Sequence, residues 1–208
     1  MGRAGSMLEP YPIPAAPARA EIRVVNSRFI GSAACTPSVE AARAFIDEMR
    51  QLFAGARHHA YAYVVGYGAS VTEGMSDDGE PPGTAGRPML AIVRGSGLGD
   101  VTVVVTRFFG GTLLGTGGLV HAYGDATRAV LEVLPRTERI VQQQLVIEVA
   151  YAQYQRARQV LDAHQATIID EVFAVTVTLT VLLPQQQVAA CCAALAPLHA
   201  VVSETAPA

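Results

Sequence analysis

The sequence predicts an α+β protein with two domains. Half of its 208 residues are apolar, which is enough to bury a substantial core in one large domain or two small ones. A polar and charged stretch, Arg136 to Gln143, interrupts the apolar patterning and is the predicted boundary. The segments that follow it have the order β-α-β-β-α-β, which is the split ferredoxin-like pattern.

The N-terminal domain is predicted over residues 21–135, behind a flexible lead-in at residues 1–20 that is rich in Ala and Pro. Ser38 is the predicted N-cap of its first helix, and Gly55 ends that helix. The spacing of the apolar residues defines the other elements. In order, we predict one or two strands within 21–25 and 28–35, a helix at 39–53, a strand at 60–68, a short helix at 89–94, a strand at 101–106 and a helix at 119–134.

The C-terminal domain is predicted over residues 141–208. In order, its elements are a strand at 145–150, a helix at 154–164, strands at 167–172 and 174–183, a helix at 185–195 and a strand at 200–203. The helices are rich in Ala and Gln and hold no cluster of catalytic residue types. The pattern therefore favours a scaffold or docking module.

The basic residues exclude two kinds of chemistry. All 15 are arginine, and the chain contains no lysine. A P-loop needs a lysine to hold phosphates, and a Schiff-base enzyme needs a lysine amine, so neither is present. The net charge of -3 and the pI near 5.9 argue against a broadly basic nucleic-acid binder, although a local basic patch stays open.

The apolar runs and the cysteines predict a cytoplasmic protein that has no membrane partner. No run reaches the roughly 18 apolar residues that a spanning helix needs, and the N-terminal stretch lacks the apolar core of a secretory signal. The three cysteines, Cys35, Cys191 and Cys192, are odd in number and lack the CxxC spacing of a zinc or redox site. We expect no cofactor.

The first candidate functional segment is the stretch from Asp77 to Pro88. Its glycines permit positive φ angles and its prolines stiffen the backbone, so the loop can present groups to a partner. Its three carboxylates could hold a divalent ion through water, but a capped and solvated turn is the favoured interpretation. The candidate binding residues of this stretch are Asp77, Asp78, Glu80, Gly83, Thr84, Gly86 and Arg87.

The second candidate segment, Arg107 to Gly118, lies between a predicted buried strand and a predicted helix. A glycine-rich turn there directs backbone N–H groups and the positive helix end toward one point, which suits a phosphate or a carboxylate. Close packing of helix against strand is an equally good explanation, and the spacing is not that of a Rossmann fingerprint. The candidate binding residues are Arg107, Gly110, Gly111, Gly115, Gly117 and Gly118.

The dipeptide His58-His59 comes just before a predicted strand. Neighbouring residues of a strand face opposite sides, so at most one of these imidazoles can point into a site. His58 is the candidate binding residue, and a structural role is the favoured alternative.

These segments together resemble a known family. Asp77-Asp78-Gly79-Glu80-Pro81, Gly83-Thr84-Ala85-Gly86-Arg87-Pro88, Arg107-Phe108-Phe109-Gly110-Gly111 and Leu114-Gly115-Thr116-Gly117-Gly118-Leu119 are similar, in this order, to segments of the IMPACT/YigZ family. The resemblance extends over about residues 27–131. It implies a first domain similar to the second domain of small-subunit ribosomal protein five and to domain four of elongation factor G. It also implies a ferredoxin-like tail similar to domain five of elongation factor G.

The resemblance further implies a role in translation, because the eukaryotic members restrain a translational stress pathway. The leading hypothesis is a regulatory protein that contacts RNA, the ribosome or a translational regulatory protein through its glycine-rich segments. Two departures weaken the case for a strongly basic groove: Leu113 and His121 stand where some members have a lysine and an arginine. The alternative is a hydrolase that uses the acidic loop and a histidine, with or without a divalent metal, and no catalytic residue is assigned.

Overall fold

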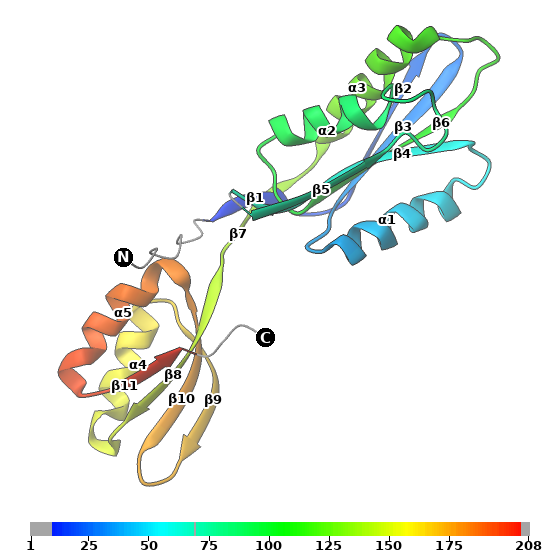
Figure 1. The fold of residues 1–208 in the computed structure, drawn as a ribbon. Helices are drawn as coiled ribbons and strands as arrows, with labels where there is room; N and C mark the ends of the chain where they lie inside the picture. The colour runs from blue at the N-terminus through cyan, green and yellow to red at the C-terminus, as the bar shows by residue number, and fades with distance from the viewer. Residues whose placement is uncertain (1–9, 69, 205–208) are drawn as a thin grey trace. The chain divides into compact units, whose positions relative to one another are not determined.

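The computed structural model describes residues 10–68 and 70–204. Two compact units divide the chain between Arg139 and Ile140. The N-terminal unit contains an antiparallel sheet in the order β2-β3-β6-β4-β5 (Figure 1). Its elements are β1 (Tyr11–Pro14), β2 (Ala18–Val24), β3 (Ser27–Cys35), α1 (Val39–Leu52), β4 (His58–Tyr67), β5 (Ser70–Ser76), α2 (Gly86–Gly95), β6 (Val101–Phe108), α3 (Gly115–Val133) and β7 (Arg136–Arg139).

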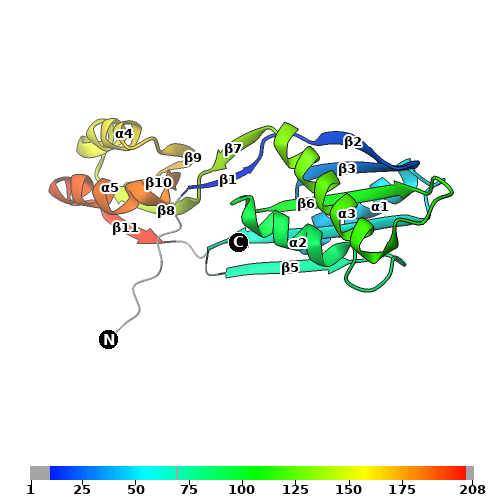
Figure 2. The same ribbon diagram turned by 90° about the horizontal axis from the view of Figure 1, so that it is seen from above.

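Helices cover both faces of this sheet. Helices α2 and α3 lie on one face and α1 lies on the other, as Figures 1 and 2 show. Strand β6 is buried along nearly its whole length because it is the central strand and is covered from both sides. Gly31 of β3 permits the close approach of α3, since a Cβ there would lie 2.7 Å from the backbone oxygen of Ala126. The main core lies between the sheet and the pair α2 and α3.

Helix α1 forms where its sequence predicts it. The Ser38 side chain accepts a hydrogen bond from the Ala41 backbone N–H at 3.1 Å, which caps the first turn. The helix then buries Ala42, Ile46 and Met49 along one stripe. The contacts of Ile46 and Met49 with Val104 of β6 form a second, smaller core on this face of the sheet.

Asp100 connects the two ends of the N-terminal unit. Strand β1 pairs antiparallel with β7, so that Tyr11 stands opposite Arg139. The buried Asp100 carboxylate accepts hydrogen bonds from the Tyr11 hydroxyl at 2.9 Å, from Arg139 at 2.6 Å and from the Gly66 backbone N–H at 2.8 Å. Burial and the hydrogen bond to Asp100 raise the pKa of Tyr11 to about 12. The ribbon of β1 and β7 is therefore fastened to the body of the unit.

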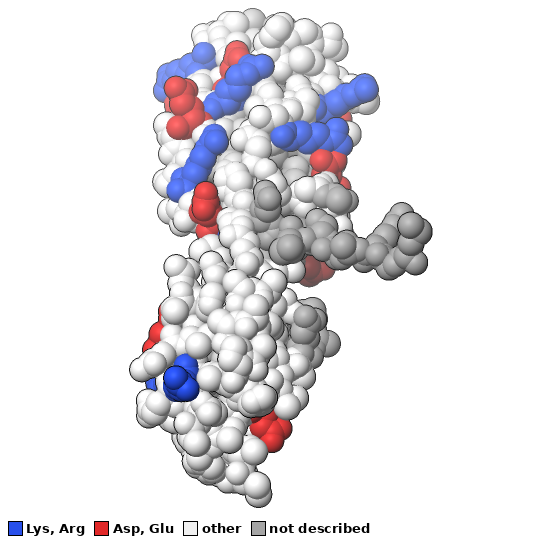
Figure 3. All heavy atoms as spheres, turned by 90° about the vertical axis from the view of Figure 1, so that its left-hand side faces the viewer, with Lys and Arg blue, Asp and Glu red and all other residues white. Residues whose placement is uncertain are grey.

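The C-terminal unit has the predicted ferredoxin-like arrangement, with the antiparallel strand order β11-β8-β10-β9. Alternate residues of β8 and β10 form its core with α4 and α5. The face of this unit seen in Figure 3 carries few charged side chains. Its elements are β8 (Gln142–Val149), α4 (Tyr154–Ala163), β9 (Thr167–Phe173), β10 (Val177–Pro184), α5 (Val188–Leu195) and β11 (Val201–Glu204).

Several features of the N-terminal unit differ from the sequence prediction. Residues 11–20 are not a lead-in, because they form β1 and the start of β2; residues 1–9 lie outside the described part. Strand β5 was not predicted, because it is an exposed edge strand without an alternating apolar pattern. Residues 136–139 form β7 and belong to the N-terminal unit, since pairing with β1 overrides their polar character.

No helix in the described residues is long and apolar enough to cross a membrane.

Candidate functional site

A buried ion pair joins the two glycine-rich stretches. Nη1 of Arg107, on β6, lies 2.8 Å from Oε1 of Glu80, and both side chains are almost fully buried. The Tyr123 hydroxyl of α3 donates to the same Glu80 oxygen at 2.8 Å. Burial and the Glu80 carboxylate raise the pKa of Tyr123, which keeps this hydroxyl a donor. Stretches 77–88 and 107–118 are therefore parts of one surface.

Arg107 is held on several sides. Register places it between Phe29 of β3 and His58 of β4. Its guanidinium lies 5.5 Å from the ring centroids of both Phe29 and Phe109. Its Nη2 donates to the Ser27 hydroxyl at 3.5 Å, whereas its buried Nε–H has no hydrogen-bond partner among the described residues.

A cavity of about 430 Å³ opens above this ion pair. Glu80 and Arg107 form part of its wall, and the first turn of α3 forms another part. Phe109 and Leu113 are exposed by 50% and 86% of their surfaces, so the cavity is bordered by unusually accessible apolar groups. Its remaining polar wall residues include Arg57, His58 and Thr116.

Asp77 holds the acidic loop together from within. One carboxylate oxygen accepts hydrogen bonds from the backbone N–H groups of Ala85 and Gly86 at 2.9 Å, and the other accepts from Gly83 at 2.8 Å. Partial burial acts to raise the pKa of Asp77, but the three N–H donors outweigh it and the pKa lies below its ordinary value. Asp77 thus anchors the start of α2.

We expect Asp77→Asn to destabilise the protein at neutral pH, and this loss should shrink in acid. A carboxylate with a lowered pKa stabilises the fold above its unfolded pKa of about 3.9, and the contribution disappears as the pH falls through the folded pKa. Urea unfolding of both proteins between about pH 7 and pH 2 measures the difference. Asp125→Asn, at an exposed position of α3, is the control. A loss that does not depend on pH would contradict this role of the charge.

Asp78 and the two histidines connect the loop to β4 and α1. The Asp78 carboxylate accepts from Arg50 at 3.0 Å and from the His59 backbone N–H at 2.7 Å. Nδ1 of His58 donates to the Asp78 backbone oxygen at 2.9 Å. His58 lines the cavity, and His59 is buried with a pKa lowered by that burial. The two imidazoles thus have different surroundings, as expected for neighbours in a strand.

The glycines serve two structural purposes. Gly110 allows the backbone to pass against Asn26, since a Cβ there would lie 2.0 Å from the Asn26 backbone, and Gly86 likewise passes close to Ser76. Gly83, Gly111 and Gly115 adopt positive φ angles that favour glycine. At these positions, glycine is therefore required by the course of the backbone.

The remaining candidates lie at the ends of α2 and α3. Thr84 is buried and donates to the Pro81 backbone oxygen at 2.7 Å, whereas Arg87 is exposed in the first turn of α2. Gly117 and Gly118 lie in the first turn of α3. The helix begins at Gly115, whereas the sequence predicted a start at residue 119. No side chain caps this turn, so its N–H groups are free to bind an acceptor.

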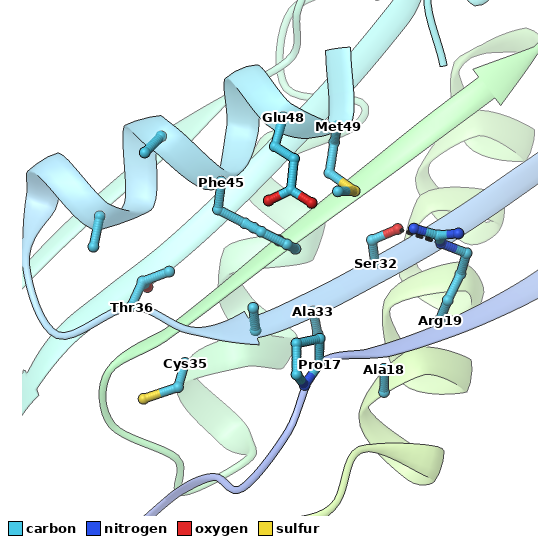
Figure 4. A pocket seen from close by; sticks show the side chains of 13 residues that line it. Pro17, Ala18, Arg19, Ser32, Ala33, Cys35, Thr36, Phe45, Glu48 and Met49 are labelled. Carbon is cyan, nitrogen blue, oxygen red and sulfur yellow. Dashed lines mark hydrogen bonds between the residues drawn. The ribbon is translucent and has the colours of Figure 1, made fainter. Parts of the chain in front are cut away.

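A larger cavity of about 590 Å³ lies on the other face of the sheet, beside α1 (Figure 4). Phe45, Glu48 and Met49 of α1 extend toward the strands, and Arg19 bonds to the Ser32 hydroxyl across the opposite wall at 3.3 Å. Burial raises the pKa of the Cys35 thiol on this wall, which disfavours the reactive thiolate. Neither glycine-rich stretch contributes to this cavity.

Five residues of the site that the structure brings together were not among the candidates from the sequence: Arg57, Phe109, Leu113, Thr116 and Tyr123. Tyr123 lies on a predicted helix as one apolar residue among many, and only tertiary packing places it on Glu80. The exposure of Phe109 and Leu113 contradicts their apolar character, so the sequence carries no signal for it. Among the described residues, no group of three or more His, Cys, Asp or Glu side chains is placed to hold a metal ion.

Comparisons with known proteins extend over both units. A family model described as "Impact N-terminal domain" matches residues 25–131, and a model of a domain of unknown function matches residues 147–198. The chain is 42% identical over 183 residues to "IMPACT family member YigZ" of Escherichia coli, covering 88% of this chain and 90% of that one. It is 38% identical over 164 residues to an "IMPACT family member" of Haemophilus influenzae, covering 78% and 80% of the two chains.

Two solved structures are similar in different degrees. A "Crystal structure of an hypothetical protein" is 39% identical, covers 97% of this chain and 100% of its own, and has a TM-score of 0.73. The two-domain translational regulator Yih1 is 24% identical, covers 64% of this chain and 52% of its own, and has a TM-score of 0.35. The first supports the same two-unit fold, and the second is too weak a likeness to support an inference.

Proposed function

Because this chain belongs to the IMPACT family, we propose that it acts in the control of translation as a binding protein. The proposal extends to this chain the role that the family resemblance implies. Its partner would be RNA, the ribosome or a translational regulatory protein, and the surface around the 430 Å³ cavity would contact it.

One observation carries the choice of a binding surface. The chemically reactive groups of the acidic loop are turned inward, where Asp77, Asp78 and Glu80 each accept hydrogen bonds from the protein itself. The groups that stay accessible around the cavity are apolar side chains, backbone N–H donors and the polar wall residues Arg57, His58 and Thr116, a mixture that suits recognition of a partner. This distribution supports recognition, and no specific contact favours the hydrolase hypothesis.

The mixture of groups suits a macromolecular surface. Exposed apolar residues such as Leu113 contribute binding energy when a partner covers them. The cavity wall itself combines Arg57 and Arg107 with Glu80 and apolar side chains, so contacts of mixed character are expected at the partner interface.

We expect the protein to sediment with ribosomes in a cell lysate, and Leu113→Asp to lower the bound fraction about fivefold, the effect of losing one interface anchor. Val175→Asp is the matched control, because Val175 is also an apolar residue, exposed by 94% of its surface, and it lies in the C-terminal unit. Nuclease treatment then distinguishes two kinds of partner. If the partner is RNA, the nuclease releases the protein, and if the partner is a protein, the protein stays bound.

The result that would overturn the proposal is equally clear. If the protein co-sediments with neither ribosomes nor any translation factor, before or after nuclease treatment, a role in translation is not supported. An equal loss in Leu113→Asp and Val175→Asp would instead remove the cavity from the interface.

A further inference from the structure

We propose that the cavity beside the α3 N-terminus binds the carboxylate side chain of an acidic residue on a partner protein, next to an apolar residue of that partner. This inference rests on the proposed function and names the chemistry of the same site. It commits to a protein partner and to one kind of anchoring group.

The first support is the start of α3. This helix has 19 residues, and the residue before it, Leu114, supplies no capping side chain. The first-turn residues Gly115, Thr116 and Gly117 are exposed, and the turn contains no acidic side chain that could compete for its N–H groups. An oxygen acceptor with negative charge is the group that such a helix start stabilises.

The second support is independent of the helix. Arg107, which is exposed by only 6%, lines the same cavity, and its buried Nε–H lacks a hydrogen-bond partner among the described residues. A buried donor without an acceptor is costly. The Nε atom itself is enclosed by protein, so a carboxylate in the cavity would not bond to it directly but would place negative charge next to this incompletely satisfied guanidinium.

The cationic and apolar groups of the wall favour a carboxylate on a protein over the backbone of RNA. Glu80 already neutralises Arg107 at 2.8 Å, so Arg57 is the wall cation that forms no ion pair among the described residues. Affinity for RNA depends on several phosphate contacts with cations. A single carboxylate needs one cation and a few N–H donors, and the exposed Phe109 and Leu113 would cover an apolar neighbour of the acidic residue.

Titration of the ¹⁵N-labelled full chain with acetyl-Leu-Glu-Phe-amide tests the proposal. We expect saturable shifts of the Thr116 and Gly117 amide resonances, with half-saturation at a concentration about tenfold lower than for acetyl-Leu-Gln-Phe-amide, because an ionised acceptor strengthens the hydrogen bonds. Equal responses to the two peptides would overturn the proposal. So would a stronger response of these amides to hexauridylate, which would assign the cavity to RNA.

Two variants separate the contributions. Arg57→Gln should weaken binding of the Glu peptide about fivefold and leave the Gln peptide unaffected, whereas Arg43→Gln, at an exposed position of α1, should change neither. Thr116→Pro removes one N–H donor at a place in the helix that tolerates proline, and should also weaken the Glu peptide. Unchanged affinity in both Arg57→Gln and Thr116→Pro would contradict the proposed contacts.

The peptide result is separate from the sedimentation result. A chain that sediments with ribosomes but does not distinguish the peptides keeps the proposed function and loses this inference. A chain that binds the Glu peptide but associates with no part of the translation apparatus keeps the cavity chemistry and loses the proposed function.

Discussion

Glu80→Gln should destabilise the protein by about 3–5 kcal/mol, the usual cost of removing one partner from a buried ion pair. The substitution keeps the size of the side chain but leaves the Arg107 guanidinium without a counter-charge at a position exposed by only 6%. The glutamine can still accept a hydrogen bond from Tyr123, so the effect isolates the charge. Urea unfolding at neutral pH measures it as a lowered midpoint.

Two further variants identify the source of this loss. Tyr123→Phe removes one hydrogen bond to Glu80 and should cost about 1 kcal/mol. The double substitution Glu80→Gln with Arg107→Met removes both charges and should recover a large part of the stability, because an uncharged buried pair has no unmet charge. If Glu80→Gln alone costs no more than Tyr123→Phe, the ion pair does not hold the two stretches together.

Gly110→Ala should destabilise the protein by about 2 kcal/mol or more, as expected when an added methyl group has no space. Its Cβ would lie 2.0 Å from backbone atoms of Asn26, which cannot rotate away as a side chain can. The loop would have to move, and the hydrogen bond from the Gly110 N–H to the Ser27 hydroxyl, 3.2 Å long, would be lost. Thermal unfolding followed by circular dichroism measures the change.

Gly95→Ala is the matched control for this experiment. Gly95 lies at the end of α2, and a Cβ there would meet no atom within 4 Å. Alanine is also the better helix former, so this variant should be as stable as the wild type or slightly more stable. A loss of similar size in both variants would contradict the steric explanation for Gly110.

The helices and the buried strands could be predicted from the sequence, because local signals and the tertiary structure agree there. Ser38 is a capping residue in a capping position, and the stripe from Ala42 to Met49 follows the helical period. Strands β5 and β7 could not be predicted, because their own residues are mostly exposed and lack an alternating apolar pattern. Strand β7 also depends on pairing with β1, which is far away in the sequence.

The sequence predicted where the candidate site lies, but it did not predict which contacts the residues of the site make. Glycine and proline content marks both stretches, and the resemblance to the IMPACT family marks them again. The inward direction of Asp77 and Glu80 depends on backbone N–H groups and an arginine that lie elsewhere in the chain. From composition alone these carboxylates appear free to bind a partner, although in the fold they already accept hydrogen bonds from the protein itself.

The β1 and β7 ribbon brings the first and last described strands of the N-terminal unit together, with Tyr11 opposite Arg139. A protein unit whose two ends are adjacent tolerates circular permutation and insertion into another chain, because a short connection can close it. The two ends of the unit could then be joined by a short linker. The N-terminal unit is thus suited to be moved as a module between proteins. Asp100 holds its first and last described strands together through hydrogen bonds from Tyr11 and Arg139.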